Sequence, residues 1–351
     1  MLRCTKCVMP ETWAGITFDK NGVCNSCREA ERSSVIDWNK RQLQLSKILQ
    51  KYREYAKQKG SKYDCIVGYS GGKDTSYTLW AMVVKYHMKP LVVTFDHGFT
   101  LPQGSEWNLM EIPKKLNCDH LRFTIGNGLR NALCHTASKA NGDFCWYCHN
   151  GVGAFPARIS KLFDIPLQIW GEPPSMYDPE GPYKNEGLEE FNKKHFETVT
   201  QAGITPSTIL PPNYELADLL PMTWPDGEFP LQGIYLGNYE PWNQREHVAI
   251  ITRELHWNHY DTEGTYVDWD KADCPMEPVR DWQKFIKRGL GRATFQASKD
   301  IREGLIDRQE ALRLIEQYDG KRPAILDTFL QQIGMTETEF NEITKRHILN
   351  S

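Results

Sequence analysis

The amino-acid sequence predicts an α/β protein with a doubly wound parallel sheet, a cysteine-rich N-terminal unit and a helical C-terminal region. Between residues 64 and 170, short apolar segments alternate with segments of helical spacing. Strands separated by helices of this length form parallel sheets that are covered on both faces. Two Cys-x-x-Cys pairs precede this region, and helical periodicity dominates from Glu277 onward.

The composition is that of a globular protein. The chain has 351 residues, of which 40% are hydrophobic and 25% charged, enough for one large or two medium domains. No apolar run approaches the roughly 18 residues of a membrane span, and the N-terminus has no signal-peptide core, so we expect a cytoplasmic protein. The net charge of −3 argues against a broad electrostatic contact with nucleic acid.

The N-terminal cysteines predict a metal site. Cys4 and Cys7 are separated by sixteen residues from Cys24 and Cys27. Two thiolate pairs across a short hairpin can supply the four tetrahedral ligands of Zn²⁺. A redox dithiol, the alternative, would need one pair rather than two. Four protein ligands leave no open position, so we expect a structural zinc ribbon over residues 1–33.

The sheet domain is predicted to span residues 34–255 and to begin with a helix at 34–58. Its other expected elements are strands at 64–68, 90–95, 120–125, 165–170 and 233–239, and helices at 75–87, 105–116, 128–140, 151–163 and 244–255. A proline-rich insert at 173–230, with one helix near 187–201, has the length and composition of a lid or binding surface. The C-terminal helical region is expected to span 256–351.

The turn after the first predicted strand has the features of an anion site. Cys65-Ile-Val67 leads into Ser70-Gly-Gly72, and a helical segment follows. In this arrangement the backbone N–H groups and the positive end of the helix dipole point at one anion. Lys73 adds a cation, and Asp74 is suited to hold Mg²⁺. The turn also offers three hydroxyl donors, Ser70, Thr75 and Ser76.

The order Ser-Gly-Gly-Lys-Asp-Thr at residues 70–75 differs from the common P-loop pattern Gly-x-x-x-x-Gly-Lys-[Ser/Thr]. It resembles the PP-loop of the ATP-pyrophosphatase superfamily, which implies an adenine nucleotide alpha hydrolase-like fold and cleavage of ATP to AMP and pyrophosphate. The alternative is a glycine-rich turn that only redirects the chain. The resemblance implies a phosphate site made of Ser70, Gly71, Gly72, Lys73, Asp74, Thr75 and Ser76.

Ligands of parallel sheets bind at the carboxyl ends of the strands. The second predicted strand ends in Thr94, Phe95 and Asp96, and the fourth leads to Glu172. In PP-loop enzymes the end of the second strand contacts adenine and ribose, so the resemblance assigns the first three residues to adenosine. Glu172 is a candidate magnesium ligand or base. Each acid could equally be an ordinary loop carboxylate.

Motifs over residues 4–322 resemble the N-acetyl sugar amidotransferase family of surface-polysaccharide biosynthesis, which includes lipopolysaccharide O-antigen. The motifs are Cys4–Thr12, Phe144–His149, Ile169–Glu172, Gly237–Trp242, Lys287–Ala293 and Ala297–Gly304. The resemblance implies an ATP-dependent enzyme that acts on a nucleotide-linked sugar, with ATP, Mg²⁺ and Zn²⁺ as its ligands. The implied catalytic residues are Lys73, Asp74 and Glu172.

The implied reaction converts an acetamido group into an acetamidino group. The amide oxygen attacks the α-phosphorus of ATP, pyrophosphate leaves, and ammonia then displaces AMP. None of the ten cysteines lies in an evident glutaminase nucleophile motif. The family therefore implies that ammonia comes from partner glutaminase and cyclase-like subunits, similar to those of imidazole-glycerol-phosphate synthase.

A second set of cysteines leaves alternatives open. Cys145 and Cys148 are predicted to lie in a loop between two helices, far in sequence from Cys274. With His149 they could complete a second zinc site, and with an open position they would suit an iron–sulfur cluster. They could also be small buried side chains. A zinc ribbon, a PP-loop and an internal Cys-x-x-Cys resemble tRNA 2-thiolation enzymes as well, and a non-catalytic zinc-ribbon adaptor is a third alternative.

Overall fold

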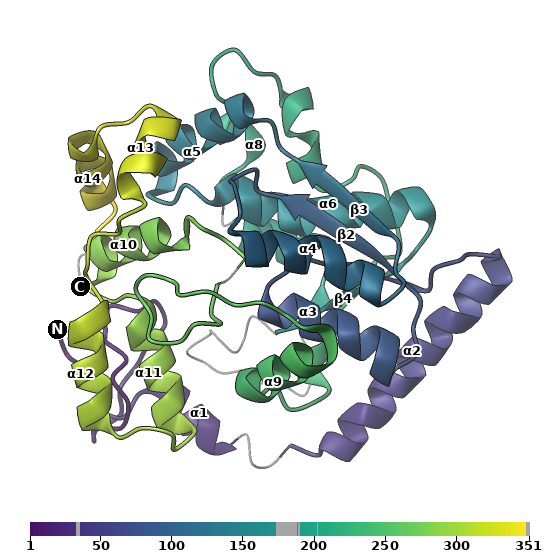
Figure 1. The fold of residues 1–351 in the computed structure, drawn as a ribbon, viewed down its shortest axis with the longest axis horizontal. Coiled ribbons are helices and arrows are strands. Elements are labelled where there is room, and N and C mark those ends of the chain that lie inside the picture. Colours follow the sequence, from purple (N-terminus) through teal and green to yellow (C-terminus); the bar gives the residue numbers. More distant parts are fainter. Residues whose placement is uncertain (33–35, 173–187, 189, 202, 272, 349–351) are drawn as a thin grey trace.

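The computed structural model describes residues 1–32, 36–172, 188, 190–201, 203–271 and 273–348. Within these residues one six-stranded sheet forms the centre of the fold (Figure 1). Its strands, in spatial order, are β3 (His120–Thr124), β2 (Pro90–Asp96), β1 (Cys65–Gly68), β4 (Leu167–Trp170), β6 (Gln232–Tyr235) and β5 (Glu190–Phe191). Neighbouring strands are parallel except β5 and β6. The predicted parallel-dominated α/β fold is confirmed, with an antiparallel edge strand that the sequence did not indicate.

Helices cover both faces of this sheet. The helices of the sheet domain are α2 (Trp38–Lys59), α3 (Lys73–Trp80), α4 (Gln103–Lys115), α5 (Asn127–Asn141), α6 (Trp146–Phe163), α7 (Lys193–His195), α8 (Pro206–Ile209) and α9 (Gln244–Leu255). Val67 and Val92 face a core shared with α3, α4 and α9, whereas Ile66 and Leu91 face α6 on the other side. Alternate residues of one strand thus serve two cores, which is why β1 and β2 are apolar without interruption.

The C-terminal region is helical, as predicted. Its helices are α10 (Glu277–Arg288), α11 (Arg292–Arg302), α12 (Arg308–Tyr318), α13 (Leu326–Ile333) and α14 (Glu337–Arg346). Helices α13 and α14 contact α5 of the sheet domain, and α10 contacts α14. Phe144 and Phe329 meet in this interface with ring centroids 4.4 Å apart. The loop from Leu255 to Glu277 carries the chain across the sheet domain before these helices begin (Figure 1).

The N-terminal unit, residues 1–32, packs against the C-terminal helices rather than standing alone, and we call it the N-terminal knuckle. Two isolated bridges, Arg3 to Pro10 and Phe18 to Cys24, replace a regular hairpin, and α1 (Asn25–Arg32), which the sequence did not predict, carries Cys27. Val8 packs against residues of α11 and α12, beside which the knuckle lies in Figure 1. The boundaries predicted at 1–33, 34–255 and 256–351 remain predictions, since knuckle and C-terminal helices share a core.

Several predicted elements differ from the structure. The helix predicted at 34–58 begins at Trp38, capped by Asp37, and the strand predicted at 233–239 ends at Tyr235 because a 3₁₀ turn follows. Where a helix was predicted near 187–201, the described residues form strand β5, the short helix α7 and a π-helical turn at Phe196–Thr200. Residues 173–187 of the predicted proline-rich insert, and residues 33–35, lie outside the described residues.

The prediction that Cys145 and Cys148 lie in a loop is wrong. Helix α6 starts at Trp146, five residues earlier than predicted, so Cys145 caps the helix and Cys148 lies in its first turn. Burial explains the difference, because Trp146 and Tyr147 belong to a buried cluster that also contains residues of the C-terminal helices, such as Phe329. Gly151, which weakens the helical pattern in the sequence, is needed there: a Cβ would lie 2.4 Å from the Phe95 ring.

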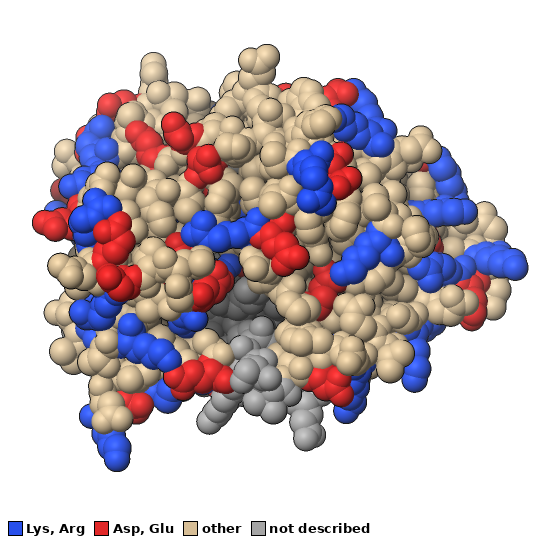
Figure 2. Space-filling model, turned by 60° about the horizontal axis from the view of Figure 1, so that its bottom comes forward, with Lys and Arg blue, Asp and Glu red and all other residues tan. Residues whose placement is uncertain are grey.

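The surface is mixed in charge. On the face shown in Figure 2, Lys and Arg side chains lie next to Asp and Glu side chains, and neither sign dominates. This pattern agrees with the small net charge of −3. In the described parts of the chain, no helix has the length and apolar character that crossing a membrane requires.

Candidate functional site

The predicted anion site lies where the sheet reverses its order. Strand β1 pairs with β2 on one side and with β4 on the other, so the turn after β1 opens into the crevice where α/β sheets bind ligands. Gly71 in this turn has a φ of 80°, and a Cβ there would lie 3.1 Å from the backbone nitrogen of Leu109. Only glycine fits both demands. The turn ends at Gly72, directly before the first residue of α3.

The hydroxyl groups of the turn divide into two sets. Ser70 Oγ lies 3.1 Å from Thr75 Oγ1 and accepts a hydrogen bond from the Gly72 backbone N–H at 3.3 Å. Both hydroxyls line a cavity of about 250 Å³ at the carboxyl ends of the strands. We call it the main cavity; Phe95, Asp96, Cys148, Asp273 and Cys274 also line it. Ser76, by contrast, is fully buried and contacts the Tyr69 hydroxyl at 3.3 Å, away from the cavity lining.

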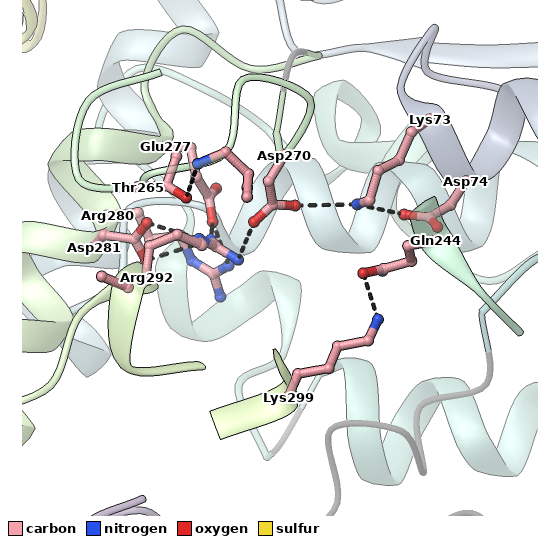
Figure 3. A network of polar contacts seen from close by, with 12 residues as sticks. Lys73, Asp74, Gln244, Thr265, Asp270, Glu277, Arg280, Asp281, Arg292 and Lys299 are labelled. Carbon is pink, nitrogen blue, oxygen red and sulfur yellow. Dashed lines mark hydrogen bonds and ion pairs between the residues drawn. The ribbon is translucent and has the colours of Figure 1, made fainter. Parts of the chain in front are cut away.

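Lys73 is held between two carboxylates. Its Nζ lies 2.9 Å from Asp74 Oδ2 and 3.0 Å from Asp270 Oδ1, and its side chain is only 5% exposed (Figure 3). Burial alone would lower the pKa of Lys73, but the carboxylates of Asp74 and Asp270 raise it above the usual value. Lys73 therefore stays protonated at neutral pH. The second Asp74 oxygen lies 3.3 Å from the indole nitrogen of Trp242, which donates to it.

The charged contacts continue from Asp270 into the C-terminal helices (Figure 3). Asp270 Oδ2 lies 3.6 Å from Arg292, whose Nε donates to Asp281 at 3.0 Å and whose Nη2 pairs with Glu277. The network thus runs from α3 through the loop at Asp270 to α10 and α11. Sequence reasoning did not identify Asp270, and the only signal for Arg292 was its place in the Lys287–Ala293 motif.

The three predicted adenosine residues lie at the main cavity with different partners. Thr94 Oγ1 donates to the Tyr69 carbonyl at 2.6 Å. Asp96 accepts hydrogen bonds from the Gly98 backbone, Arg122 and Thr124 at 2.8–3.0 Å, so its oxygens already fix the ends of β2 and β3. Phe95 also lines the cavity, although its ring packs against Phe123 with centroids 5.6 Å apart. Adenosine binding by these residues remains a prediction.

Glu172 lies beside the main cavity rather than in it. Its Oε1 accepts a hydrogen bond from Gln244 at 2.9 Å, and Gln244 Oε1 in turn accepts one from Lys299 at 2.6 Å. Glu172 lines a smaller cavity of about 70 Å³, which we call the α11 cavity. Other residues that line the α11 cavity are Met9, Trp13, Asp270, Phe295, Lys299 and Arg302.

The four N-terminal cysteines meet at one point, as their spacing predicted. All four are buried, and their sulfur atoms lie within 4.8 Å of one another. The Cys4–Cys27 and Cys7–Cys24 sulfurs are 4.0 and 3.7 Å apart, close to the roughly 3.8 Å expected for tetrahedral Zn–S bonds of about 2.3 Å. Backbone N–H groups of Cys7 and Cys24 point at Cys4 Sγ at 3.4 and 3.2 Å. This donor set fits structural Zn²⁺.

Cys145, Cys148 and Cys274 converge on the main cavity together with His149. They do not form a compact ligand set: among the described residues, only the knuckle cysteines bring three or more ligand atoms within 4.8 Å of one another. Burial raises the pKa of Cys148 to about 12 and that of Cys145 well above its usual value. Because their ligand atoms do not lie close enough together to share one metal ion, the geometry favours the packing alternative.

Metal analysis tests this interpretation. We expect one zinc per chain in protein purified without oxygen, with unchanged zinc content when Cys145 and Cys148 are both replaced by serine. The Cys24→Ser variant should lose the metal, because it removes one of four ligands. Two zinc ions per chain, or iron together with sulfide, would contradict the packing interpretation and assign a metal to the second cysteine set.

Residues 257–349 match the family model of the C-terminal domain of WbpG-like LPS biosynthesis proteins. The C-terminal region is thus similar to a domain of LPS biosynthesis proteins, which supports a role in polysaccharide biosynthesis. An uncharacterized protein of Methanocaldococcus jannaschii is 24% identical over 171 residues, which are 48% of this chain and 58% of that protein. The chain thus spans just over half the length of this curated relative.

The matched segment supplies much of the site. Asp270 holds Lys73 from one side, and Asp273 and Cys274 line the main cavity. Lys299 and Arg302 line the α11 cavity. The candidate site therefore lies between the sheet domain and the C-terminal region, and neither part contains it alone.

Proposed function

We propose that this protein is an ATP-dependent amidotransferase that converts an acetamido group of a nucleotide-linked sugar into an acetamidino group. One observation carries the proposal: a turn of the PP-loop type, followed by a buried Lys73 and a partly buried Asp74, is completed by a segment that matches an LPS biosynthesis domain. The match supports the role in polysaccharide biosynthesis. The turn supports the ATP chemistry.

The residues present fit ATP as a substrate. The turn at Ser70–Gly72 precedes the N-terminus of α3, an arrangement that favours phosphate. Lys73 is cationic, and Phe95 with Leu101 offers an apolar surface of the kind that adenine contacts. Asp74 is the carboxylate that would hold Mg²⁺ beside the phosphates, because this ion prefers oxygen ligands.

The proposed reaction has two displacements. The acetamido oxygen forms a bond to the α-phosphorus while the bond to the β-phosphate oxygen breaks, so pyrophosphate leaves with the electron pair. Ammonia then attacks the activated carbon, a proton passes from nitrogen to a base, and AMP leaves with the former amide oxygen. Lys73 and the backbone N–H groups of the turn offset charge on the phosphates. Glu172 is the candidate base.

The cysteines support an external source of ammonia. A glutaminase nucleophile needs a thiolate of lowered pKa. Burial instead raises the pKa of each described cysteine outside the knuckle, and that of Cys118 reaches about 11. We therefore assign ammonia production to a separate glutaminase with a cyclase-like subunit.

The test uses the purified chain with ATP, Mg²⁺ and a panel of nucleotide-linked N-acetyl sugars. With high ammonium salt we expect AMP and pyrophosphate, together with a sugar in which one oxygen is replaced by one NH in high-resolution mass spectra. With glutamine instead of ammonium we expect no product until a partner glutaminase is added. Glutamine-dependent turnover by the isolated chain would contradict the partner assignment, and release of ADP and phosphate would contradict the ATP chemistry.

The second candidate function is tRNA 2-thiolation. The observation that favours it is the convergence of Cys145, Cys148 and Cys274 on the cavity that Ser70 and Thr75 also line. The LPS-domain match and the mixed surface charge of Figure 2 argue against it. We expect the content of 2-thiolated nucleosides in tRNA, measured by mass spectrometry, to be the same with and without this protein.

A further inference from the structure

The α11 cavity lies next to the PP-loop turn but is separate from the main cavity. Gly171 and Lys271 line the main cavity, whereas their chain neighbours Glu172 and Asp270 line the α11 cavity. The two cavities therefore lie on opposite sides of the same backbone segments. Asp270 also contacts Lys73 at 3.0 Å, so a single side chain, that of Asp270, connects the α11 cavity with the proposed ATP site.

Two cations of this cavity, Lys299 and Arg302, have few charged partners among the described residues. Lys299 donates to the neutral Gln244 at 2.6 Å, and Glu303 lies at 4.0 Å. Burial lowers the pKa of Lys299 even though the Glu172 carboxylate acts in the opposite direction. Among the described residues, Arg302 has no hydrogen bond or ion pair, and its Nη1 is buried. Both side chains are partly removed from water, so Arg302, which has no partner among these residues, and Lys299, whose carboxylate partner is distant, would each gain from a bound anion.

The remaining charges of the cavity are already engaged. Arg292 pairs with Asp270, Glu277 and Asp281 (Figure 3), and Glu172 accepts from Gln244. Part of the cavity lining is aromatic. Trp13 of the knuckle meets Phe295 of α11 edge to face, with ring centroids 4.5 Å apart. A cationic side next to aromatic rings suits a ligand that carries phosphate beside a sugar or a base.

We propose that Lys299 and Arg302 bind one phosphate of the diphosphate of the acceptor, a nucleoside diphosphate-linked sugar. The volume of about 70 Å³ is that of roughly two water molecules at about 30 Å³ each, which suits a phosphate group and not a whole nucleotide. The rest of the acceptor extends beyond the cavity. The identity of the acceptor in this inference rests on the proposed function. The expectation that the cavity binds a phosphate group does not, because it follows from the two cations.

A purely structural role for the two cations makes a different prediction. Lys299 and Arg302 lie in the last turn of α11, where cations stabilise the negative end of the helix dipole. Such a role would appear as lower thermal stability after substitution, with no effect on phosphate affinity. Arg302→Lys keeps the positive charge, so it does not by itself distinguish the structural role from phosphate binding. It serves as the control that preserves the charge while the side chain changes.

The experiment is calorimetric titration of the full chain whose PP-loop turn is saturated with α,β-methylene-ATP. UDP, CDP, GDP and dTDP are titrated separately, and at least one should bind with a stoichiometry of one. Lys299→Gln and Arg302→Gln should each weaken that binding by roughly tenfold or more, as expected for loss of one charge-assisted contact. Arg302→Lys should retain most of it. Arg313→Gln, at an exposed cation of α12 paired with Glu310, should change nothing.

The outcomes separate this inference from the proposed function. Binding of the ATP analogue without binding of any nucleoside diphosphate would overturn the inference and leave the ATP site intact. Displacement of the analogue by the diphosphate, or weaker analogue binding in Arg302→Gln, would assign the cations to the phosphates of ATP and also overturn it. Loss of analogue binding with an Arg302-dependent diphosphate site would contradict the ATP chemistry and support the inference. Melting curves of each variant identify any loss of folding. If Arg302→Gln does not fold, the diphosphate affinity of Lys299→Gln decides whether the inference holds.

Discussion

Replacing Lys73 by methionine is expected to abolish pyrophosphate release and to lower the stability of the protein. Lys73 is 5% exposed and lies between Asp74 and Asp270 at 2.9 and 3.0 Å, so its removal leaves two carboxylates close together without their cation. Breaking such a buried pair costs roughly 3–5 kcal/mol. Loss of a preorganised charge at the phosphates should slow the reaction by at least about 100- to 1,000-fold. Pyrophosphate release and thermal unfolding measure the two effects.

A double variant separates stability from chemistry. Lys73→Met combined with Asp270→Asn removes one of the two carboxylates that lose Lys73, so we expect part of the lost melting temperature to return while pyrophosphate release stays absent. Asp74→Asn should also abolish release, because the carboxylate assigned to Mg²⁺ becomes a weaker neutral ligand. A Lys73→Met protein that still releases pyrophosphate at the wild-type rate would show that the turn does not act on ATP.

Replacing Cys24 by serine is expected to loosen the C-terminal helices as well as the N-terminal knuckle. Structural zinc contributes roughly 10–16 kcal/mol of binding free energy in small zinc domains, comparable to the roughly 5–15 kcal/mol that stabilises a whole domain. Val8 shares a buried cluster with Ala297 of α11 and Ala311 of α12, so loss of the knuckle exposes that cluster. Hydrogen exchange should therefore increase in both helices.

Zinc content, melting temperature and hydrogen exchange of α11 and α12 measure this effect. Cys118→Ser is the matched control, because Cys118 lies outside the knuckle and is only partly buried. It should keep both zinc and stability. A quadruple variant of Cys4, Cys7, Cys24 and Cys27 that remains soluble and fully active would contradict the structural role of the metal.

The sequence predicted those parts of the site whose signals are local. Cys65-Ile-Val67, Gly71 and Lys73 follow one another along the chain, so the apolar run, the turn glycine and the helix start could be recognised together, and the structure confirms strand, turn and helix. The knuckle cysteines were predictable for a similar reason, since the spacing of two short pairs restricts where four sulfurs can meet. The start of α6 could not be predicted from the sequence, because it depends on the burial of Trp146 in the folded protein.

Only the tertiary structure identified the residues that complete the site. Asp270 is one of 45 acidic residues, and nothing in its neighbours along the chain distinguishes it. Arg292, one of 42 Lys and Arg residues, was marked only by its place in the Lys287–Ala293 motif. Their roles follow from burial: an ammonium as deeply buried as that of Lys73 requires a carboxylate partner, and Asp270, once buried, requires Arg292 in turn. Such requirements arise only after distant segments pack together, so the sequence determined the turn and the cluster of four cysteines, and packing determined what surrounds them.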